Sequence, residues 1–165
     1  GLAGGIRVSK ASLRVDTYGN VDELISTLGF ARSICDAAEI VEFVRAVQRE
    51  LFKIGSSLAT PPESAKPQVP IELEMVERLT AEVHRVEAIE GMLSDWSVSG
   101  AHTAAAAFDV ARTVCRRAER GVVRRTEAGE PVQPHILPYL NRLSDLLFVL
   151  ARVVNYRGGV PETEW

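Results

Sequence analysis

Hydrophobic residues recur at every third or fourth position in five stretches of the chain, which is the spacing of helices that each bury one face. Almost no segment alternates hydrophobic and polar residues in the way that a half-buried strand does. The pattern therefore predicts an all-α fold, a bundle of five helices. We expect these helices over residues 20–35, 40–58, 71–89, 103–125 and 134–156.

Prolines, glycines and polar residues separate these stretches. Residues 1–19 carry several glycines and are expected to form an N-terminal arm, after which Asn20 or Asp22 would cap the first helix. The four prolines within residues 61–70 should stop the second helix and form a loop. A second loop is expected over residues 94–103, between the third and fourth helices.

Length and composition fit one domain, residues 1–165, with enough hydrophobic residues to bury a core. The formal net charge of −3 gives no sign of a nucleic-acid partner. The longest apolar runs, such as residues 146–151, are too short to cross a bilayer, and no signal-peptide pattern opens the chain. We therefore expect a cytoplasmic protein with no membrane partner. Cys35 and Cys115 lie in amphipathic patterns and are expected to be buried free thiols.

A row of arginines runs along the fourth predicted helix. Its members are Arg112, Arg116, Arg117, Arg120 and Arg124. Three of them are spaced by four residues and lie on one side of a helix, so the row is a candidate clamp for a polyphosphate. The alternative is a solvated face whose arginines pair with Glu119 and Glu127.

Further polar residues occupy the fifth predicted helix and the start of the first. Asn141 and Asp145 share a face at a spacing of four, beside a strongly apolar face, and either form a structural hydrogen-bond network or contact a ligand. Asp22 and Glu23 near the expected helix start could cap it, and Asp22 could also pair with an arginine on another helix.

The remaining candidates lie in or near loops. Trp96, in a loop rich in serine and glycine, either packs onto the bundle or meets a ligand. His84, His102 and His135 do not have the spacing of metal ligands, so we expect no metal held by protein side chains alone. The chain contains no nucleotide-binding glycine loop and no hydrolase or metalloprotease motif. The residues by themselves therefore do not specify a reaction.

Several segments, in order along the chain, resemble the PduO-type ATP:corrinoid adenosyltransferases. Residues 7–24 are similar to the family's arm and first helix, and Leu-Ala-Thr-Pro at 58–61 also matches. Residues 111–120, with Arg-Arg-Ala-Glu-Arg, resemble its arginine-rich nucleotide helix. Residues 139–152, with Leu-Asn-Arg-Leu-Ser-Asp, resemble its last helix.

The resemblance implies a homotrimer of five-helix subunits with an active site at each subunit interface, and Mg²⁺ as a cofactor. It implies that Asp22 pairs with Arg112 to shape the corrinoid site. It also implies that Trp96 displaces the lower axial ligand of the corrinoid, although the Trp96 loop lacks the family's proline and one of its glycines, and Ile25 replaces an asparagine. The residues expected to contact ATP are Lys10, Arg116, Arg117, Glu119, Arg120 and Asn141.

The implied reaction joins the 5′-deoxyadenosyl group of ATP to the cobalt of a reduced corrinoid and gives adenosylcobalamin and triphosphate. The substrates would be ATP and cob(II)alamin or cob(I)alamin, and an adenosylcobalamin-dependent enzyme could receive the product. The family's glycine- and threonine-bearing phosphate arm would lie upstream of Gly1. The alternative hypothesis is a catalytically weakened relative that binds and delivers adenosylcobalamin or nucleotide.

Overall fold

The computed structural model describes residue 2 and residues 5–92, 97–161 and 163–164. Five α-helices make up most of these residues, which confirms the predicted all-helical fold with five helices. They are α1 Leu13–Ser33, α2 Ala38–Ala59, α3 Leu73–Glu87, α4 Thr103–Glu127 and α5 Ile136–Arg157. Two short strands, β1 Ser97–Val98 and β2 Thr163–Glu164, pair antiparallel, a contact that the sequence did not predict. Among the described residues, no helix is both long and apolar enough to cross a membrane.

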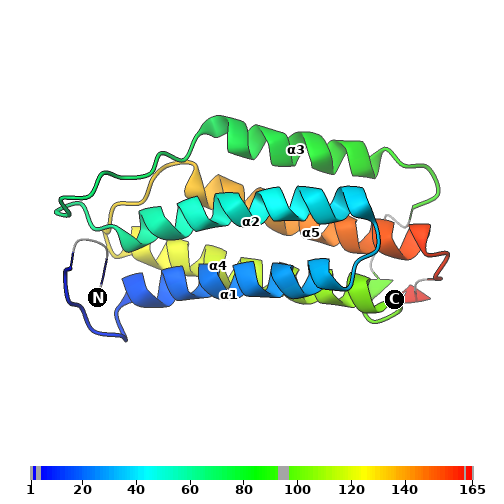
Figure 1. Cartoon of the computed structure of the whole chain (residues 1–165), viewed down its shortest axis with the longest axis horizontal. Helices are drawn as coiled ribbons and strands as arrows, with labels where there is room; N and C mark the ends of the chain where they lie inside the picture. The colour runs from blue at the N-terminus through cyan, green and yellow to red at the C-terminus, as the bar shows by residue number, and fades with distance from the viewer. Residues whose placement is uncertain (1, 3–4, 93–96, 162, 165) are drawn as a thin grey trace.

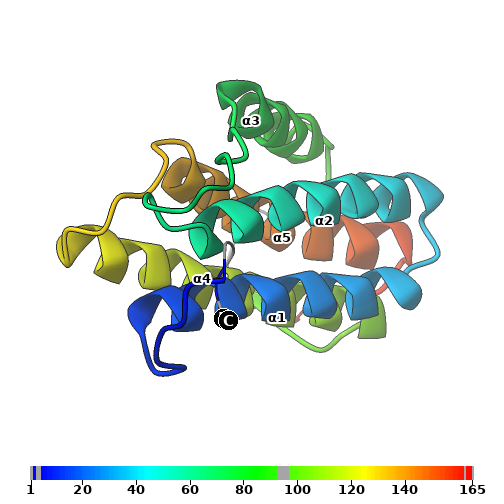
Figure 2. The same cartoon turned by 60° about the vertical axis from the view of Figure 1, so that its left-hand side comes forward.

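Helices α1, α2, α4 and α5 form a compact group, and α3 lies against the outside of this group. In this group α4 packs against both α1 and α5, and α1 also packs against α2 (Figure 1). Neighbours in this chain of contacts run in opposite directions. Helix α3 lies beside α5 and away from α1 and α4 (Figure 2). This order leaves one side of the α4–α5 pair without a covering helix.

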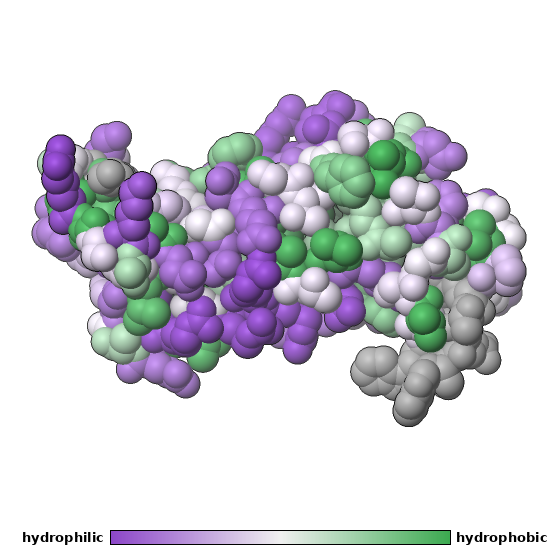
Figure 3. All heavy atoms as spheres, turned by 90° about the horizontal axis from the view of Figure 1, so that it is seen from below, coloured by the Kyte–Doolittle hydropathy of each residue, from purple (hydrophilic) through white to green (hydrophobic). Residues whose placement is uncertain are grey.

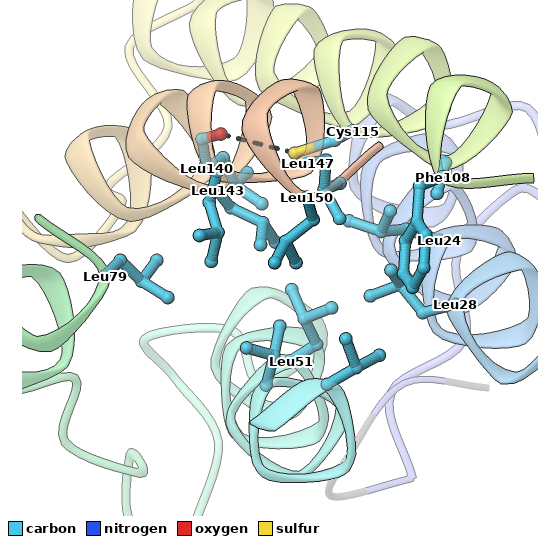
Figure 4. Close-up of a cluster of buried hydrophobic side chains, with 14 of the residues drawn as sticks. Leu24, Leu28, Leu51, Leu79, Phe108, Cys115, Leu140, Leu143, Leu147 and Leu150 are labelled. Atoms are coloured by element: carbon cyan, nitrogen blue, oxygen red, sulfur yellow. Dashed lines mark hydrogen bonds between the residues drawn. The ribbon is translucent and has the colours of Figure 1, made fainter. Parts of the chain in front are cut away.

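All five helices contribute to a single hydrophobic core. The leucines Leu24 and Leu28 of α1 meet Leu51 of α2 and Phe108 of α4, and Leu79 of α3 approaches from the other side (Figure 4). Along α5, buried leucines recur at the helical spacing and face this centre. They are Leu140, Leu143, Leu147 and Leu150. The core fixes the helices that carry the candidate site.

Helix α1 begins earlier than the sequence predicted, so the expected arm over residues 1–19 is too long. Ser12 caps the helix, and its hydroxyl accepts a hydrogen bond from the Val15 N–H at 3.3 Å. Asn20 and Asp22 therefore lie inside the helix and do not cap it. The periodicity missed these first two turns because buried Thr17 occupies a core-facing position, where its hydroxyl donates to the Leu13 carbonyl at 2.6 Å.

Helix α3 is two residues shorter at each end than expected. Ile71 lies before the helix and is buried, and its N–H donates to the Gln133 side chain at 3.0 Å. Ile89 lies after the helix and packs against the core. Both residues fit the hydrophobic period without being helical, because the segments just before and just after α3 also pack against the core. The other four helices match their predicted bounds to within two residues, apart from the start of α1.

One buried polar cluster joins α2, α3 and α5. The Tyr139 hydroxyl donates to Glu50 Oε2 at 2.7 Å, and Arg78 pairs with the same oxygen at 2.6 Å. Tyr139 is fully buried, and burial together with the neighbouring Glu50 carboxylate raises the pKa of its hydroxyl. The hydroxyl therefore stays protonated at neutral pH and serves as a donor. The cluster connects α3 to the rest of the bundle.

We expect Tyr139→Phe to lower the free energy of unfolding by about 1–3 kcal/mol, because Glu50 would lose a donor in a buried site. Tyr156→Phe is the matched control, since Tyr156 is exposed and its hydroxyl has no hydrogen-bond partner among the described residues. Urea unfolding followed by circular dichroism measures both. Equal stability of the two variants would contradict a stabilising role for the hydroxyl.

Candidate functional site

Helices α4 and α5 together form one polar face outside the core. Arg116 and Arg120 are exposed on α4 and make no ion pair or side-chain hydrogen bond within the described part of the chain. Beside them, the Asn141 amide of α5 donates to Glu119 Oε1 at 3.0 Å. This bond ties the two helices together at the centre of the face and orients both polar groups. Four of the residues predicted to contact ATP therefore lie on one face.

Other arginines of the predicted row point toward α1. Arg117 pairs with Glu23, and its Nε donates to the Asn20 side chain at 3.1 Å. Arg124 pairs with Asp16 at 3.2 Å. The row is thus divided between two sides of α4. The arginines on one side bind residues of α1, and those on the other side have guanidinium groups that are available to a ligand. Sequence spacing alone could not assign partners to these side chains.

Arg112 lies on α4 about two turns before Arg120, and among the described residues its acidic partner is on its own helix. Its Nε is 4.0 Å from Asp109 Oδ1. Asp109 is buried and accepts a hydrogen bond of 2.8 Å from Arg152 of α5. Sequence reasoning did not select Asp109, although its position three residues before Arg112 places the two on the same side of the helix.

Asp22 lies on a different side of the molecule from Arg112. It is exposed and lines a hollow of about 300 Å³ between α1 and α2, together with Tyr18, Ile25 and Phe52. Within the described residues Asp22 forms no ion pair, and Arg112 pairs with Asp109. One copy of the chain does not bring Asp22 and Arg112 together.

Lys10 is exposed just before α1, at the end of the bundle where α4 finishes. A polar cluster fixes this end: Glu130 Oε2 accepts from Arg125 at 3.0 Å and from Arg14 at 3.2 Å. Arg125 is almost fully enclosed and also donates to the Leu58 carbonyl at 3.0 Å, and burial lowers the pKa of its guanidinium. The start of α1, and with it the attachment of Lys10, is therefore held against α4.

Three other residues singled out in the sequence, one tryptophan and two cysteines, have different outcomes. Trp96 lies outside the described residues. Cys115 is a free, fully buried thiol behind the α4–α5 face, as expected, and donates to the Leu140 carbonyl at 3.2 Å (Figure 4). Burial raises the pKa of this thiol, so it stays protonated. Cys35 is also free but only partly buried.

The surface over α1 and α4 is uneven in polarity. Hydrophilic side chains cover most of the end where α1 begins and α4 finishes, and hydrophobic side chains gather to the right of the centre (Figure 3). On α4, Arg117 and Arg124 make ion pairs with residues of α1. Cationic groups are thus concentrated along the second half of α4.

A match to a family model covers residues 1–154, and the model describes cobalamin adenosyltransferases. The chain belongs to the cobalamin adenosyltransferase family. The cobalamin adenosyltransferase of Cupriavidus metallidurans is 38% identical over all of this chain and 87% of its own length. The corrinoid adenosyltransferase of Bacillus subtilis is 37% identical over all of this chain and 86% of its own length. Both comparisons confirm the resemblance noted in the sequence.

Solved structures of the family share the fold. A variant of the PduO-type ATP:co(I)rrinoid adenosyltransferase from Lactobacillus reuteri, complexed with ATP, superposes with a TM-score of 0.90 at 28% identity. That match covers all of this chain and 93% of the other. Another variant of that enzyme, complexed with cobalamin and ATP, has a TM-score of 0.87 at 30% identity, over 96% and 88% of the two chains.

The division of the arginines in this adenosyltransferase gives a test on the protein without ligand. Arg117→Ala should lower the free energy of unfolding by about 1–2 kcal/mol, because it removes the hydrogen bond to Asn20 and an exposed ion pair. Arg116→Ala should change it by less than about 0.5 kcal/mol, since that side chain has no partner within the described residues. Urea titration compares the two variants. The partner assignment is wrong if Arg116→Ala destabilises the protein more than Arg117→Ala.

Proposed function

We propose that the α4–α5 face binds ATP and supports transfer of its 5′-deoxyadenosyl group to the cobalt of a reduced corrinoid, with release of triphosphate. The observation that carries this proposal is the pair of exposed guanidinium groups, Arg116 and Arg120, which have no partner within the described residues. A planar guanidinium can donate to two phosphate oxygens at once. Two of them one turn apart match a chain of phosphates.

In this reaction cobalt(I) donates an electron pair to C5′ of ATP and forms the Co–C5′ bond. The bond from C5′ to the phosphate oxygen breaks, and triphosphate leaves with the electron pair of that broken bond. Negative charge grows on the leaving group as the bond breaks. Cationic donors fixed beside the phosphates stabilise this charge and keep C5′ in line with the attacking cobalt. Arg116 and Arg120 are proposed for the first task, and Asn141, held by Glu119, for orienting the nucleotide.

The proposed site extends along α4, and its two ends are expected to bind different parts of the substrates. Arg112 and Arg120 are separated by about 12 Å of helix, from a rise of 1.5 Å per residue. Lys10 lies beyond Arg120, at the end of the bundle that the Glu130 cluster fixes. We therefore place the triphosphate toward Lys10 and Arg120 and the corrinoid toward Arg112. Arg117 is held by α1, and a direct contact between Arg117 and ATP stays a prediction.

A second copy of the chain would complete the site. Asp22 lies beside the α1–α2 hollow, on a different side from Arg112, so the pairing that the family resemblance implies requires Asp22 from a neighbouring subunit. Phe52 lines the same hollow with 61% of its surface exposed, which favours burial against a partner. A homotrimer, with the α1–α2 side of each subunit against the α4–α5 face of the next, satisfies both features.

We further propose that Mg²⁺ enters with the phosphates of ATP. No group of three histidine, cysteine, aspartate or glutamate side chains that could hold a metal occurs in the described ranges. On the proposed face Glu119 is already bonded to Asn141, and Asp145 is exposed nearby. This is consistent with the usual preference of Mg²⁺ for phosphates and water over a complete protein cage. Hand-over of adenosylcobalamin to a receiving enzyme, and a cytoplasmic location, stay predictions.

Arg116→Ala should weaken ATP binding by about 10- to 100-fold, because a hydrogen bond between charged groups contributes roughly 1.5–3 kcal/mol. Isothermal titration calorimetry measures the affinity, and sedimentation checks that assembly is unchanged. Arg45→Ala is the control, since Arg45 is an exposed arginine of α2 whose ion pair within the described residues is with Glu42. ATP affinity equal in the two variants would rule out the proposed clamp.

Trp96→Ala should spare ATP binding and prevent removal of the lower axial ligand, because the proposed role of Trp96 is to supply apolar bulk beside the corrinoid. Absorbance of cob(II)alamin in the presence of ATP distinguishes the five- and four-coordinate forms. Normal turnover by the variant would contradict this role. If the unaltered protein binds cob(II)alamin and ATP without any spectral change, the alternative of a binding and delivery protein is favoured.

A further inference from the structure

Three charged side chains meet where the first half of α4 faces the last turns of α5. Asp109 Oδ2 accepts a hydrogen bond of 2.8 Å from Arg152, and only 6% and 2% of these side chains are exposed. The Arg152 guanidinium also lies over the Phe148 ring, 5.0 Å from its centroid. The carboxylate is therefore fixed by a buried partner that is itself fixed by packing.

The third member of this group is Arg112, whose side chain has an enclosed inner part and an exposed outer part. Its Nε is shielded from solvent and has no hydrogen-bond partner among the described residues, and 32% of the side chain is exposed. The 4.0 Å separation from Asp109 Oδ1 is too long for a hydrogen bond. In an enclosed site, however, water screens the attraction between these charges only weakly. The exposed area belongs to the rest of the side chain.

We propose that Asp109 is a positioning residue, which holds the Arg112 guanidinium in the orientation that the corrinoid end of the site requires. This inference rests on the proposed function, in which Arg112 acts at that end. An unrestrained arginine samples many rotamers, and its contacts are weakened by the entropy of ordering it. A fixed carboxylate behind Nε restricts those rotamers before any ligand arrives.

The same arrangement preserves the positive charge of Arg112. The short hydrogen bond of Asp109 goes to Arg152, and Arg112 interacts with the other oxygen only at long range. Asp109 therefore faces two cations and makes its short hydrogen bond with only one of them, Arg152. The outer nitrogens of Arg112 remain able to bind a carboxylate or a polar group of the ligand. Arg152 acts through Asp109 and makes the carboxylate rigid.

Asp109→Asn tests the inference, because it keeps the size of the side chain and an acceptor for Arg152 but removes the charge facing Arg112. We expect kcat/KM for the corrinoid to fall by about tenfold or more, with KM for ATP within about twofold of the unaltered protein. Asp109→Glu, which keeps the charge, should restore most of the activity. Glu50→Gln is the matched control: it neutralises another buried, arginine-paired carboxylate, in the cluster between α2, α3 and α5.

A double-mutant cycle separates positioning from a general loss of stability. If Asp109 acts through Arg112, Asp109→Asn should have no further effect on corrinoid kcat/KM once Arg112→Ala is present. Independent, multiplying effects would overturn the inference and leave the proposed function intact. If Arg112→Ala alone left corrinoid kinetics unchanged, both the role of Arg112 and the inference would fail.

A measurement on the unaltered protein keeps the inference testable if Asp109→Asn does not fold. The Nε–H of Arg112, assigned in NMR spectra by comparison with Arg112→Lys, should exchange with solvent much more slowly than that of Arg116. Slow exchange agrees with an enclosed Nε–H facing Asp109. Exchange as fast as that of Arg116 would overturn the inference.

Discussion

The packing of α4 between α1 and α5 is the constraint on which the rest of the structure depends. Small buried residues, among them Ala111, Ala118 and Gly121, let the neighbouring helices approach closely. At Gly121 the helices are close enough for the Thr17 hydroxyl of α1 to donate to the Gly121 carbonyl at 3.3 Å. Because this packing occupies two sides of α4, every long side chain of the helix must face α1, face α5 or project outward. The packing thereby divides one run of arginines into groups with different tasks.

Acidic side chains near α4 determine which of its arginines are paired within the protein and which are free to bind a ligand. Arginines that face α1 or the bundle end find acidic partners there, such as Glu23 and Glu130, and stabilise the arrangement of the helices. Arg116 and Arg120 find none in the described part of the chain and are therefore suited to an anionic substrate. Near the other end, the Asp109–Arg152 pair sits behind Arg112. Arginines that are paired within the protein and the arginines proposed to bind substrate thus occupy one helix without competing for the same partners.

Much of this could be predicted from the sequence, and the gaps have physical causes. Hydrophobic periodicity gave the helix bounds to within two residues except at the start of α1, where Thr17 faces the core and bonds to its own helix. The motifs on α4 and α5 identified the family, which the comparisons confirm. Spacing could not separate Arg117 from Arg116, because partners on another helix decide which is free. Nor could it single out Asp109, whose proposed positioning role depends on its burial and on its pairing with Arg152.

The central claim is that the exposed guanidinium groups of the α4–α5 face bind the triphosphate of ATP. A crystal structure of the protein with a slowly reacting ATP analogue tests it most directly. The account predicts phosphate oxygens within hydrogen-bonding distance of Arg116 and Arg120, with the ribose toward Arg112. Triphosphate bound away from these two side chains, for example wholly within the hollow between α1 and α2, would contradict it.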